Sequence, residues 1–359
     1  MLRAPRFWLG IGGSLLFLGL FLWRADIPQM LHALRQANYW YVLPGVGLYF
    51  VALWFRTLRW RVILHPLGRP SLGRLWTVLT VGYMANNLLP VRLGELVRSY
   101  FLWEKERISA TSALATIVVE RVFDGLTLLL LALLMWSFMP MATILQSLGA
   151  QTGINWLVLT LGLSVPFFVA VGVLVVVALF PKGTVRGLLA VGRGLPPRLR
   201  TPALGLGIRF LNGLAVLKSP QRWGMILGLS LPVWLAEASM FAVIGVGFGL
   251  EGELGGWGAL GAAMVLTVVV ANLALSIPST GGGVGPFEFF AAATLTILGA
   301  PASSAAAFAL VAHMALLVPV ILLGLIYLWA ENISLMRLAR ESQRPEMVIS
   351  SARSSEGRG

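Results

Sequence analysis

Long apolar runs separated by short polar segments occupy most of the chain. The runs cover residues 7–23, 39–55, 72–89, 108–139, 156–180, 223–248, 257–278 and 310–329. A helix of about 20 predominantly apolar residues is long enough to cross a bilayer, and most of these runs approach or exceed that length. The pattern therefore predicts an all-α polytopic membrane protein.

Basic residues lie between the apolar runs in an asymmetric way. The segment 182–222 holds eight Lys or Arg and no acid. The segment after the second run is also acid-free and carries five arginines: Arg56, Arg59, Arg61, Arg69 and Arg74. Because Lys and Arg concentrate in cytoplasmic loops, we expect both segments and both termini on the cytoplasmic side of a bacterial inner membrane.

The amino-terminal residues predict a membrane span, whereas the carboxy-terminal residues predict a disordered tail. Arg3 and Arg6 precede the first apolar run, and no small-residue cleavage site follows it, so we expect an uncleaved first span. One integral membrane domain is predicted over residues 1–335. Residues 336–359 are basic and rich in Ser, Arg and Gly, which is typical of a disordered cytoplasmic tail.

Helix-breaking and polar residues interrupt two of the apolar runs. Residues 82–98 contain two Asn, one Pro, two Gly and three charges, and residues 272–288 repeat the order Asn, Pro, Gly, Glu about 190 positions downstream. A break at membrane depth is tolerated only where protein or a water-filled cavity surrounds it. Paired breaks in two halves of a chain are typical of transporters that bind substrate between repeats.

This repetition predicts six full spans and two broken or re-entrant hairpins, one entered from each face, as an inverted repeat. Eight full crossings would satisfy the same termini. No Lys or Arg occurs between Glu251 and Ala302, so the charge asymmetry leaves open whether residues 257–300 cross fully or re-enter.

Three charged residues lie within the apolar run 108–139. Glu120 and Asp124 share a helix face at i, i+4, and Arg121 is adjacent. Charges inside a span are costly and are functional candidates by default. Two interpretations stay open: a structural ion pair with Arg92, Glu95 or Arg98, or coupling to a substrate or to protons.

The two interrupted segments also contain candidate binding groups for an anion. Arg92 and Arg98 offer planar guanidinium groups that match phosphate oxygens, or they are cytoplasmic anchors. The Gly-rich segment before the helix expected at Pro286 resembles an anion-binding nest, or serves close helix packing. Its members are Ser279, Thr280, Gly281, Gly282, Gly283 and Gly285.

Further polar residues complete the candidate substrate site. Glu95 and Glu288 would follow the two breaks. A carboxylate there complements a helix dipole, or it binds a cationic headgroup or relays protons. The amides of Asn86, Asn87 and Asn272 and the mid-span Glu237 are additional candidates. His313 stands alone among apolar residues, so we expect it to be a packed core residue.

Composition restricts the chemistry. The chain has 58% hydrophobic and 11% charged residues, and its net charge of +13 lies in short loops, which does not favour nucleic acid. Cysteine is absent, which excludes disulfides and thiolate sites. With only two Asp and three His, no catalytic residue, metal or cofactor is predicted.

Three signatures follow one another along the chain: Pro90-x-Arg92-x-Gly94-Glu95-x-x-Arg98, Glu120-Arg121-x-x-Asp124, and Pro278-x-x-Gly281-Gly282-Gly283-x-Gly285-x-x-Glu288. Together they resemble the lysylphosphatidylglycerol synthase transmembrane-region family, also called flippase-like, over roughly residues 8–331. The resemblance implies a lipid translocator. The chain ends soon after its last apolar run, so we do not expect the soluble aminoacyl-transferase domain or its activity.

The sequence therefore predicts a non-enzymatic lipid translocase. Its substrate would be an anionic or aminoacylated phospholipid, or a polyprenyl-phosphate or glycolipid-type lipid. Two alternatives stay open. One is a membrane-embedded transferase acting on a lipid-linked headgroup or sugar, with Glu120, Asp124 or Glu288 as base. The other is a non-transporting organiser that recruits lipid-biosynthesis enzymes through the basic segment 182–222. A homodimer is a further candidate assembly.

Overall fold

The structure is a computed structural model that describes residues 5–89, 93–135, 181–193, 197–275, 277 and 279–341, with scattered positions between 138 and 180. The described residues are almost all helical and include no strand. The expected span 156–180 falls outside the continuously described ranges, as do the motif residues Pro90, Arg92 and Pro278.

The described residues up to 135 form six α-helices. They are α1 (Pro5–Arg24), α2 (Ile27–Gln36), α3 (Val42–Leu64), α4 (Leu72–Leu88), α5 (Gly94–Glu106) and α6 (Ala110–Met135). The second half contains α9 (Pro181–Arg193), α10 (Pro197–Gly213), α11 (Pro220–Gly247), α12 (Leu250–Glu253), α13 (Trp257–Ala274), α14 (Pro286–Ile297), α15 (Ala302–Ala330) and α16 (Leu335–Glu341). Short 3-10 turns occur at Tyr39–Tyr41, Leu214–Lys218 and Gly281–Gly283.

Four described helical stretches are long and apolar enough to cross a membrane: residues 39–64, 220–247, 257–274 and 302–330. A fifth would be the pair α1 and α2, which is bent by 85°. Helix α6 has 26 residues but carries three charges near its middle, so its polarity separates it from these apolar spans. The chain is thus an all-α, multi-pass membrane protein.

Helix α3 corrects the predicted end of the second span. The sequence placed Arg56 and Arg59 in a cytoplasmic loop after residue 55, but α3 continues to Leu64, and both guanidinium groups are buried inside the molecule. The charge asymmetry could not anticipate this, because the acids that compensate these arginines come from α6 and α11.

Both interrupted segments form helical hairpins. Helices α4 and α5 pack against each other on either side of residues 89–93, and α13 and α14 do the same around residues 275–285. Helices α5 and α14 have 13 and 12 residues, and at about 1.5 Å per residue neither spans the roughly 30 Å of a hydrocarbon core. These lengths favour a re-entrant path for α5 and α14, whereas α13, with 18 residues, is long and apolar enough to cross.

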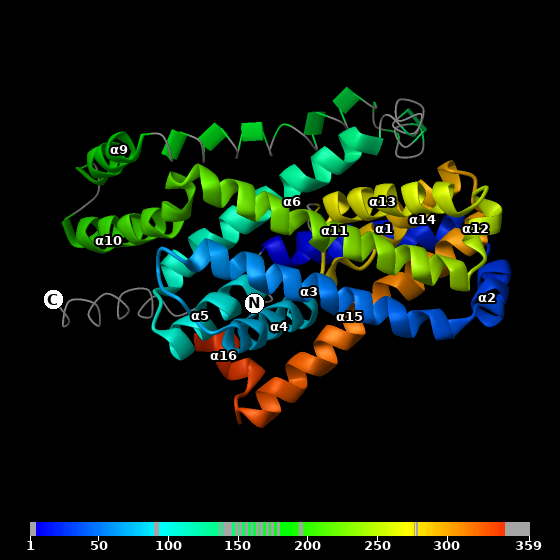
Figure 1. The fold of residues 1–359 in the computed structure, drawn as a ribbon, viewed down its shortest axis with the longest axis horizontal. Helices are drawn as coiled ribbons and strands as arrows, with labels where there is room; N and C mark the ends of the chain where they lie inside the picture. The colour runs from blue at the N-terminus through cyan, green and yellow to red at the C-terminus, as the bar shows by residue number, and fades with distance from the viewer. Residues whose placement is uncertain are drawn as a thin grey trace.

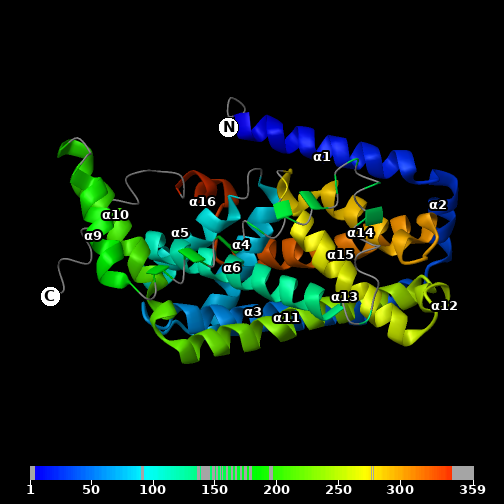
Figure 2. The same cartoon turned by 90° about the horizontal axis from the view of Figure 1, so that it is seen from above.

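The helices lie mainly along the long axis of the molecule. Helices α3 and α11 run side by side along it, α9 and α10 lie at one end, and α2 and α12 lie at the other (Figure 1 and Figure 2). The first end carries the acid-free basic segment 182–222, whereas α12 carries Glu251 and Glu253. The long axis is therefore the direction in which the charge asymmetry runs.

Two other predicted segments are corrected. The basic segment 182–222, expected as a cytoplasmic loop, contains the helices α9 and α10 and the turn Leu214–Lys218. Residues 336–341 of the expected disordered tail belong to α16, which packs against α5 and buries Leu338 and Ala339. Burial of these two side chains gives the short helix an apolar contact that its basic composition did not reveal.

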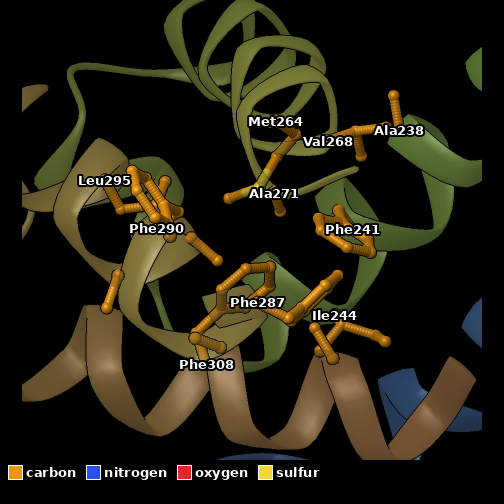
Figure 3. Packing of buried hydrophobic residues seen from close by; sticks show 14 of the residues in the cluster. Ala238, Phe241, Ile244, Met264, Val268, Ala271, Phe287, Phe290, Leu295 and Phe308 are labelled. Atoms are coloured by element: carbon orange, nitrogen blue, oxygen red, sulfur yellow. The ribbon is translucent and has the colours of Figure 1, made fainter. Parts of the chain in front are cut away.

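An aromatic core supports the second hairpin. Phe241 of α11 makes edge contacts with Phe287 of α14 and Phe308 of α15, at centroid distances of 6.1 and 5.8 Å. Met264 and Val268 of α13 pack into the same cluster (Figure 3). Edge-to-face pairs of this kind add to the stabilisation that burial provides. The core fixes the start of α14, and with it the position of the second break.

Candidate functional site

The two breaks are in direct contact, although they lie in different halves of the chain. A Cβ placed on Gly281 would lie 2.8 Å from the backbone oxygens of both Asn87 and Leu89. Only a glycine permits this approach, since real Cβ atoms need more space. The prediction that the two interrupted segments converge is therefore confirmed for the described residues.

A polar cavity of about 360 Å³ lies beside this contact. It takes residues from the middle of three long helices: Tyr49 and Arg56 from α3, Asp124 from α6 and Glu237 from α11. Both hairpins also contribute. The cavity therefore sits halfway along the spanning helices, at the depth where polar groups are most costly in lipid.

Many of the expected site residues line this cavity. They are Asn86, Asn87, Glu95, Arg121, Asp124, Glu237, Asn272, Gly282 and Gly283. Others are not among its lining residues: Arg98, Glu120, Ser279, Thr280, Gly281, Gly285 and Glu288. Arg92 lies outside the described residues, so its expected phosphate contact stays a prediction.

An ionic network behind the wall ties the first hairpin to α3, α6 and α11. Arg59 is completely buried and donates from Nη1 to Asp124 Oδ1 at 2.6 Å and to Ser230 Oγ at 2.8 Å. Its Nη2 lies 3.3 Å from Glu120 Oε1. Removing one partner from such a network leaves an uncompensated buried charge. These contacts support the structural interpretation of Glu120.

Arg98 belongs to this network rather than to the cavity surface. Its Nη2 donates to Glu120 Oε2 at 2.7 Å, and its guanidinium lies 3.6 Å from the ring centroid of Trp60. Only 4% of the side chain is exposed. Of the two arginines expected to hold a phosphate, Arg98 is therefore engaged by a carboxylate and an aromatic ring.

Two other arginines face the cavity. Arg56 donates to Glu237 Oε2 at 2.6 Å and to the hydroxyl of Tyr83 at 3.3 Å. Arg121 donates to the same hydroxyl at 3.2 Å and to Glu120 at 3.3 Å, yet 43% of its side chain is exposed. Arg121 is the cavity guanidinium with the most freedom to meet a ligand.

A carboxylate and an amide from the second half complete this wall. Glu237 Oε1 accepts from the side-chain amide of Asn272 at 3.1 Å, while its other oxygen accepts from Arg56. The mid-span acid is thus paired on both oxygens. Sequence alone named Glu237 and Asn272 as candidates but could not name the arginine between them.

The second break is held by a serine hydroxyl, by its own backbone and by the Glu288 carboxyl group. Ser14 of α1 accepts at Oγ from the Thr280 backbone N–H at 2.9 Å and donates to the Val284 carbonyl at 2.7 Å. The N–H of Gly283 donates to the Thr280 carbonyl, and that of Gly285 donates to Glu288 Oε2 at 2.8 Å. Three N–H groups of the expected anion nest are therefore already used by protein acceptors.

Glu288 and His313 form a buried pair at the edge of the cavity. His313 Nδ1 lies 2.6 Å from Glu288 Oε1, and Nε2 lies 3.0 Å from the Gly282 carbonyl. A carbonyl only accepts, so Nε2 must carry a proton, and a second proton must lie between Nδ1 and the carboxyl. His313 also stacks on Phe287 at 4.0 Å.

His313 and Arg56 are the main residues that sequence reasoning missed. His313 is packed in the core as expected, with 2% exposure, but it also lines the cavity. Tyr83 was missed as well, although it joins Arg56 to Arg121. A helical reading of the apolar run through residues 56–64 would have placed Arg56 at membrane depth.

Metal ligation is not apparent in the part of the chain that the structure describes. No group of three or more His, Asp or Glu side chains there has the geometry to hold a metal ion. The site therefore offers hydrogen bonds and paired charges, which suit recognition of a polar headgroup.

The family profile of the lysylphosphatidylglycerol synthase transmembrane region matches residues 7–324. The chain belongs to this family. The match includes both hairpins, the ionic network and the cavity. No solved structure gives a significant match.

Several curated proteins share shorter or longer parts of this family region. "Glycosyltransferase AglD" of Haloferax volcanii is 28% identical over 320 residues, which cover 82% of this chain and 49% of that protein. A "UPF0104 membrane protein" of Methanothermobacter thermautotrophicus is 39% identical over 105 residues, or 28% of this chain and 31% of that protein. The chain thus spans at most about half the length of these relatives.

Proposed function

We propose that this family member is a lipid translocase, which moves a charged lipid headgroup between leaflets through the cavity where the two hairpins meet. The observation that carries the proposal is the contact between Gly281 and the Asn87 and Leu89 backbone beside a polar cavity at mid-helix depth. Transfer of a headgroup through hydrocarbon is slow because polar groups lose their hydration there. Polar side chains at that depth would replace part of the lost hydration.

The cavity chemistry indicates the kind of headgroup. Arg121 is half-exposed and offers N–H donors to a phosphate, while Glu95 and Asp124 offer carboxylates to hydroxyl or ammonium groups. A headgroup with a phosphate and a second polar group fits this mixture of charges. Anionic or aminoacylated phospholipids and polyprenyl-phosphate or glycolipid-type lipids all meet that description.

The proposal also includes an orientation. The basic end, with α9 and α10, would face the cytoplasm together with both termini, and the end with α12 would face outward. In a bacterium the proposed location is the inner membrane. The acyl chains would stay in the bilayer, beside the apolar outer faces of the helices, while the headgroup passes the cavity.

The test is translocation by the purified chain in liposomes. Fluorescently labelled phospholipids are placed in both leaflets, and an impermeant quencher reports how fast the inner label becomes accessible. Wild type is expected to exceed empty vesicles, and Arg121→Gln to lose about tenfold, the loss expected for one charge-assisted hydrogen bond of about 1.5 kcal/mol. Arg74→Gln, at an exposed pair with Glu106, is the matched control and should keep the wild-type rate.

The result that contradicts the proposal is simple to recognise. Wild-type protein that is folded in vesicles, yet no faster than empty vesicles for any lipid class tested, would show that the cavity does not translocate these lipids. An unchanged rate in Arg121→Gln would instead reject the role given to Arg121.

A second candidate function rests on the name of one relative. The protein called "Glycosyltransferase AglD" matches 82% of this chain, so a transferase acting on a lipid-linked sugar is the alternative. Of the three carboxylates expected as a base, Asp124 is the one that lines the cavity, where its Oδ1 accepts from Arg59 and its Oδ2 lies 3.6 Å from Arg121. Turnover of a labelled sugar donor by the purified chain, lost in Asp124→Asn without loss of folding, would favour this alternative.

A further inference from the structure

A second cavity lies at the basic end of α3 and α11, away from the hairpins. It has a volume of about 470 Å³ and is lined by Leu58, Arg61, Val62, His65, Arg69 and Leu229. Nothing in the translocation pathway uses these residues. We refer to this cavity as the basic groove.

The basic groove gathers positive charge without any acid. Arg61 and Arg69 are exposed, and Arg222 donates from Nη2 to His65 Nδ1 at 3.2 Å. Within the described chain none of the three arginines forms an ion pair. The neighbouring sequence supplies no acidic partner, since no acid occurs between Asp26 and Glu95, or between Asp124 and Glu237. A cluster of guanidinium groups with no counter-charge favours an anionic ligand.

The walls of the groove change from basic to apolar in the same direction on both helices. On α3, Leu58 lies seven residues before His65, and on α11, Leu229 lies seven residues after Arg222. Seven residues are two helical turns, or about 10 Å along the axis. The basic level therefore lies at the end of both helices, and the leucine level lies about 10 Å deeper.

We propose that the basic groove binds an anionic phospholipid of the cytoplasmic leaflet, with its phosphate among Arg61, Arg69 and Arg222 and an acyl chain along Leu58, Val62 and Leu229. Basic pockets between membrane helices bind anionic headgroups, and the apolar level below supplies the place for a chain. The first turn of α11, which carries Arg222, adds the positive end of its helix dipole. This site holds a resident lipid and does not depend on translocation.

The experiment measures lipid binding to the whole chain in detergent by native mass spectrometry. The probes are phosphatidylglycerol and phosphatidylcholine with identical acyl chains. Every variant also carries Arg121→Gln, so that the central cavity does not add a phosphate site. With the groove intact, one phosphatidylglycerol should bind more tightly than phosphatidylcholine. The triple variant Arg61→Gln, Arg69→Gln, Arg222→Gln should weaken this first site by at least about tenfold, since each basic residue near an anionic lipid contributes about 1 kcal/mol.

Two further variants separate the parts of the proposal. Leu229→Trp fills the deep level and should weaken phosphatidylglycerol binding while every charge is kept. Arg74→Gln removes an arginine that is already paired with Glu106 and should leave binding unchanged. Thermal melting confirms that each variant is folded.

Three outcomes would overturn the assignment. They are equal binding of the two lipids, a triple variant that binds phosphatidylglycerol as tightly as the Arg74→Gln control, and displacement of the lipid by millimolar inorganic phosphate. The last would show that the groove recognises a free anion rather than a lipid.

Discussion

Both hairpins contain a break between two helices, but different kinds of side chain surround the two breaks. The first, between α4 and α5, is surrounded by formal charges: Arg98 and Glu120 behind it, and Glu95 and Arg121 in the cavity. At the second, between α13 and α14, the carboxylate of the break pairs with a histidine and, among the described residues, with no Lys or Arg. This break is held by Ser14, by glycine backbone and by the Glu288–His313 pair.

This difference separates two tasks that the sequence repeat had suggested were shared. Under the proposed function the charged side would recognise the headgroup, because guanidinium and carboxylate groups line the cavity there. The second side fixes the shape of the break, because the N–H groups of Thr280, Gly283 and Gly285 donate to protein acceptors. We therefore expect mutations at the first break to act mainly through electrostatics and those at the second mainly through backbone packing.

The largest effect on stability is expected at Glu120. Glu120→Gln removes the charge that faces both Arg98 and Arg59, which leaves buried guanidinium charge uncompensated. Breaking a buried pair from one side costs about 3–5 kcal/mol. Chemical unfolding of the detergent-solubilised protein measures the loss. Glu106→Gln, at the exposed pair with Arg74, should cost about 1 kcal/mol or less, and equal losses in the two variants would contradict the central role of Glu120.

The second effect concerns glycine at the break between α13 and α14. Gly285 has φ +100°, and an added Cβ would lie 2.5 Å from the Ser14 carbonyl oxygen. Gly299 has φ +108° but open space around it. Alanine at either position strains the backbone by about 1–2 kcal/mol, and Gly285→Ala should add about 1–3 kcal/mol of steric conflict. The melting temperature of Gly285→Ala should therefore be lower than that of Gly299→Ala, and the difference measures the steric conflict with α1. Equal melting temperatures would mean that α1 does not pack on the break.

His313 gives a third, intermediate effect. His313→Ala removes the partner of Glu288 Oε1 and of the Gly282 carbonyl, both buried. Hydrogen bonds to charged groups are worth about 1.5–3 kcal/mol, so a loss of about 2 kcal/mol is expected. His32→Ala, at an exposed histidine, should change stability little. If His313→Ala is as stable as His32→Ala, the pair does not hold the second break.

The smallest effect is expected at Ser14. Ser14→Ala leaves the Thr280 N–H and the Val284 carbonyl without their side-chain partner, at a cost of about 1 kcal/mol. The control is Ser304→Ala, which removes an exposed hydrogen bond to Glu253. Hydrogen exchange at residues 280–285 reports the local change. Faster exchange in Ser14→Ala alone is the expected pattern, and identical exchange in both variants would argue against the contact with α1.

The sequence predicted the two hairpins because proline, glycine and asparagine mark a helix break locally, without information from distant residues. It placed the start of α14 at Pro286 correctly for the same reason. It failed for Arg56 and Arg59, because the residues that make their burial tolerable, Glu237 and Asp124, lie far away in the sequence. The link between His313 and Glu288 spans two helices and has no spacing rule that would reveal it.

The most direct test of the convergence uses the fact that the chain has no cysteine. In the double variant Asn87→Cys, Asn272→Cys, one thiol stands in each interrupted segment and both face the same cavity. A short bifunctional thiol reagent, added to membranes, should join them within one molecule, as detected by mass spectrometry of the digest. The pair Asn87→Cys, Ser304→Cys should not be joined. Ser304 hydrogen-bonds to Glu253 of α12, which lies at one end of the molecule, and it does not line the cavity. Separate labelling of residues 87 and 272 without any cross-link would contradict the shared cavity.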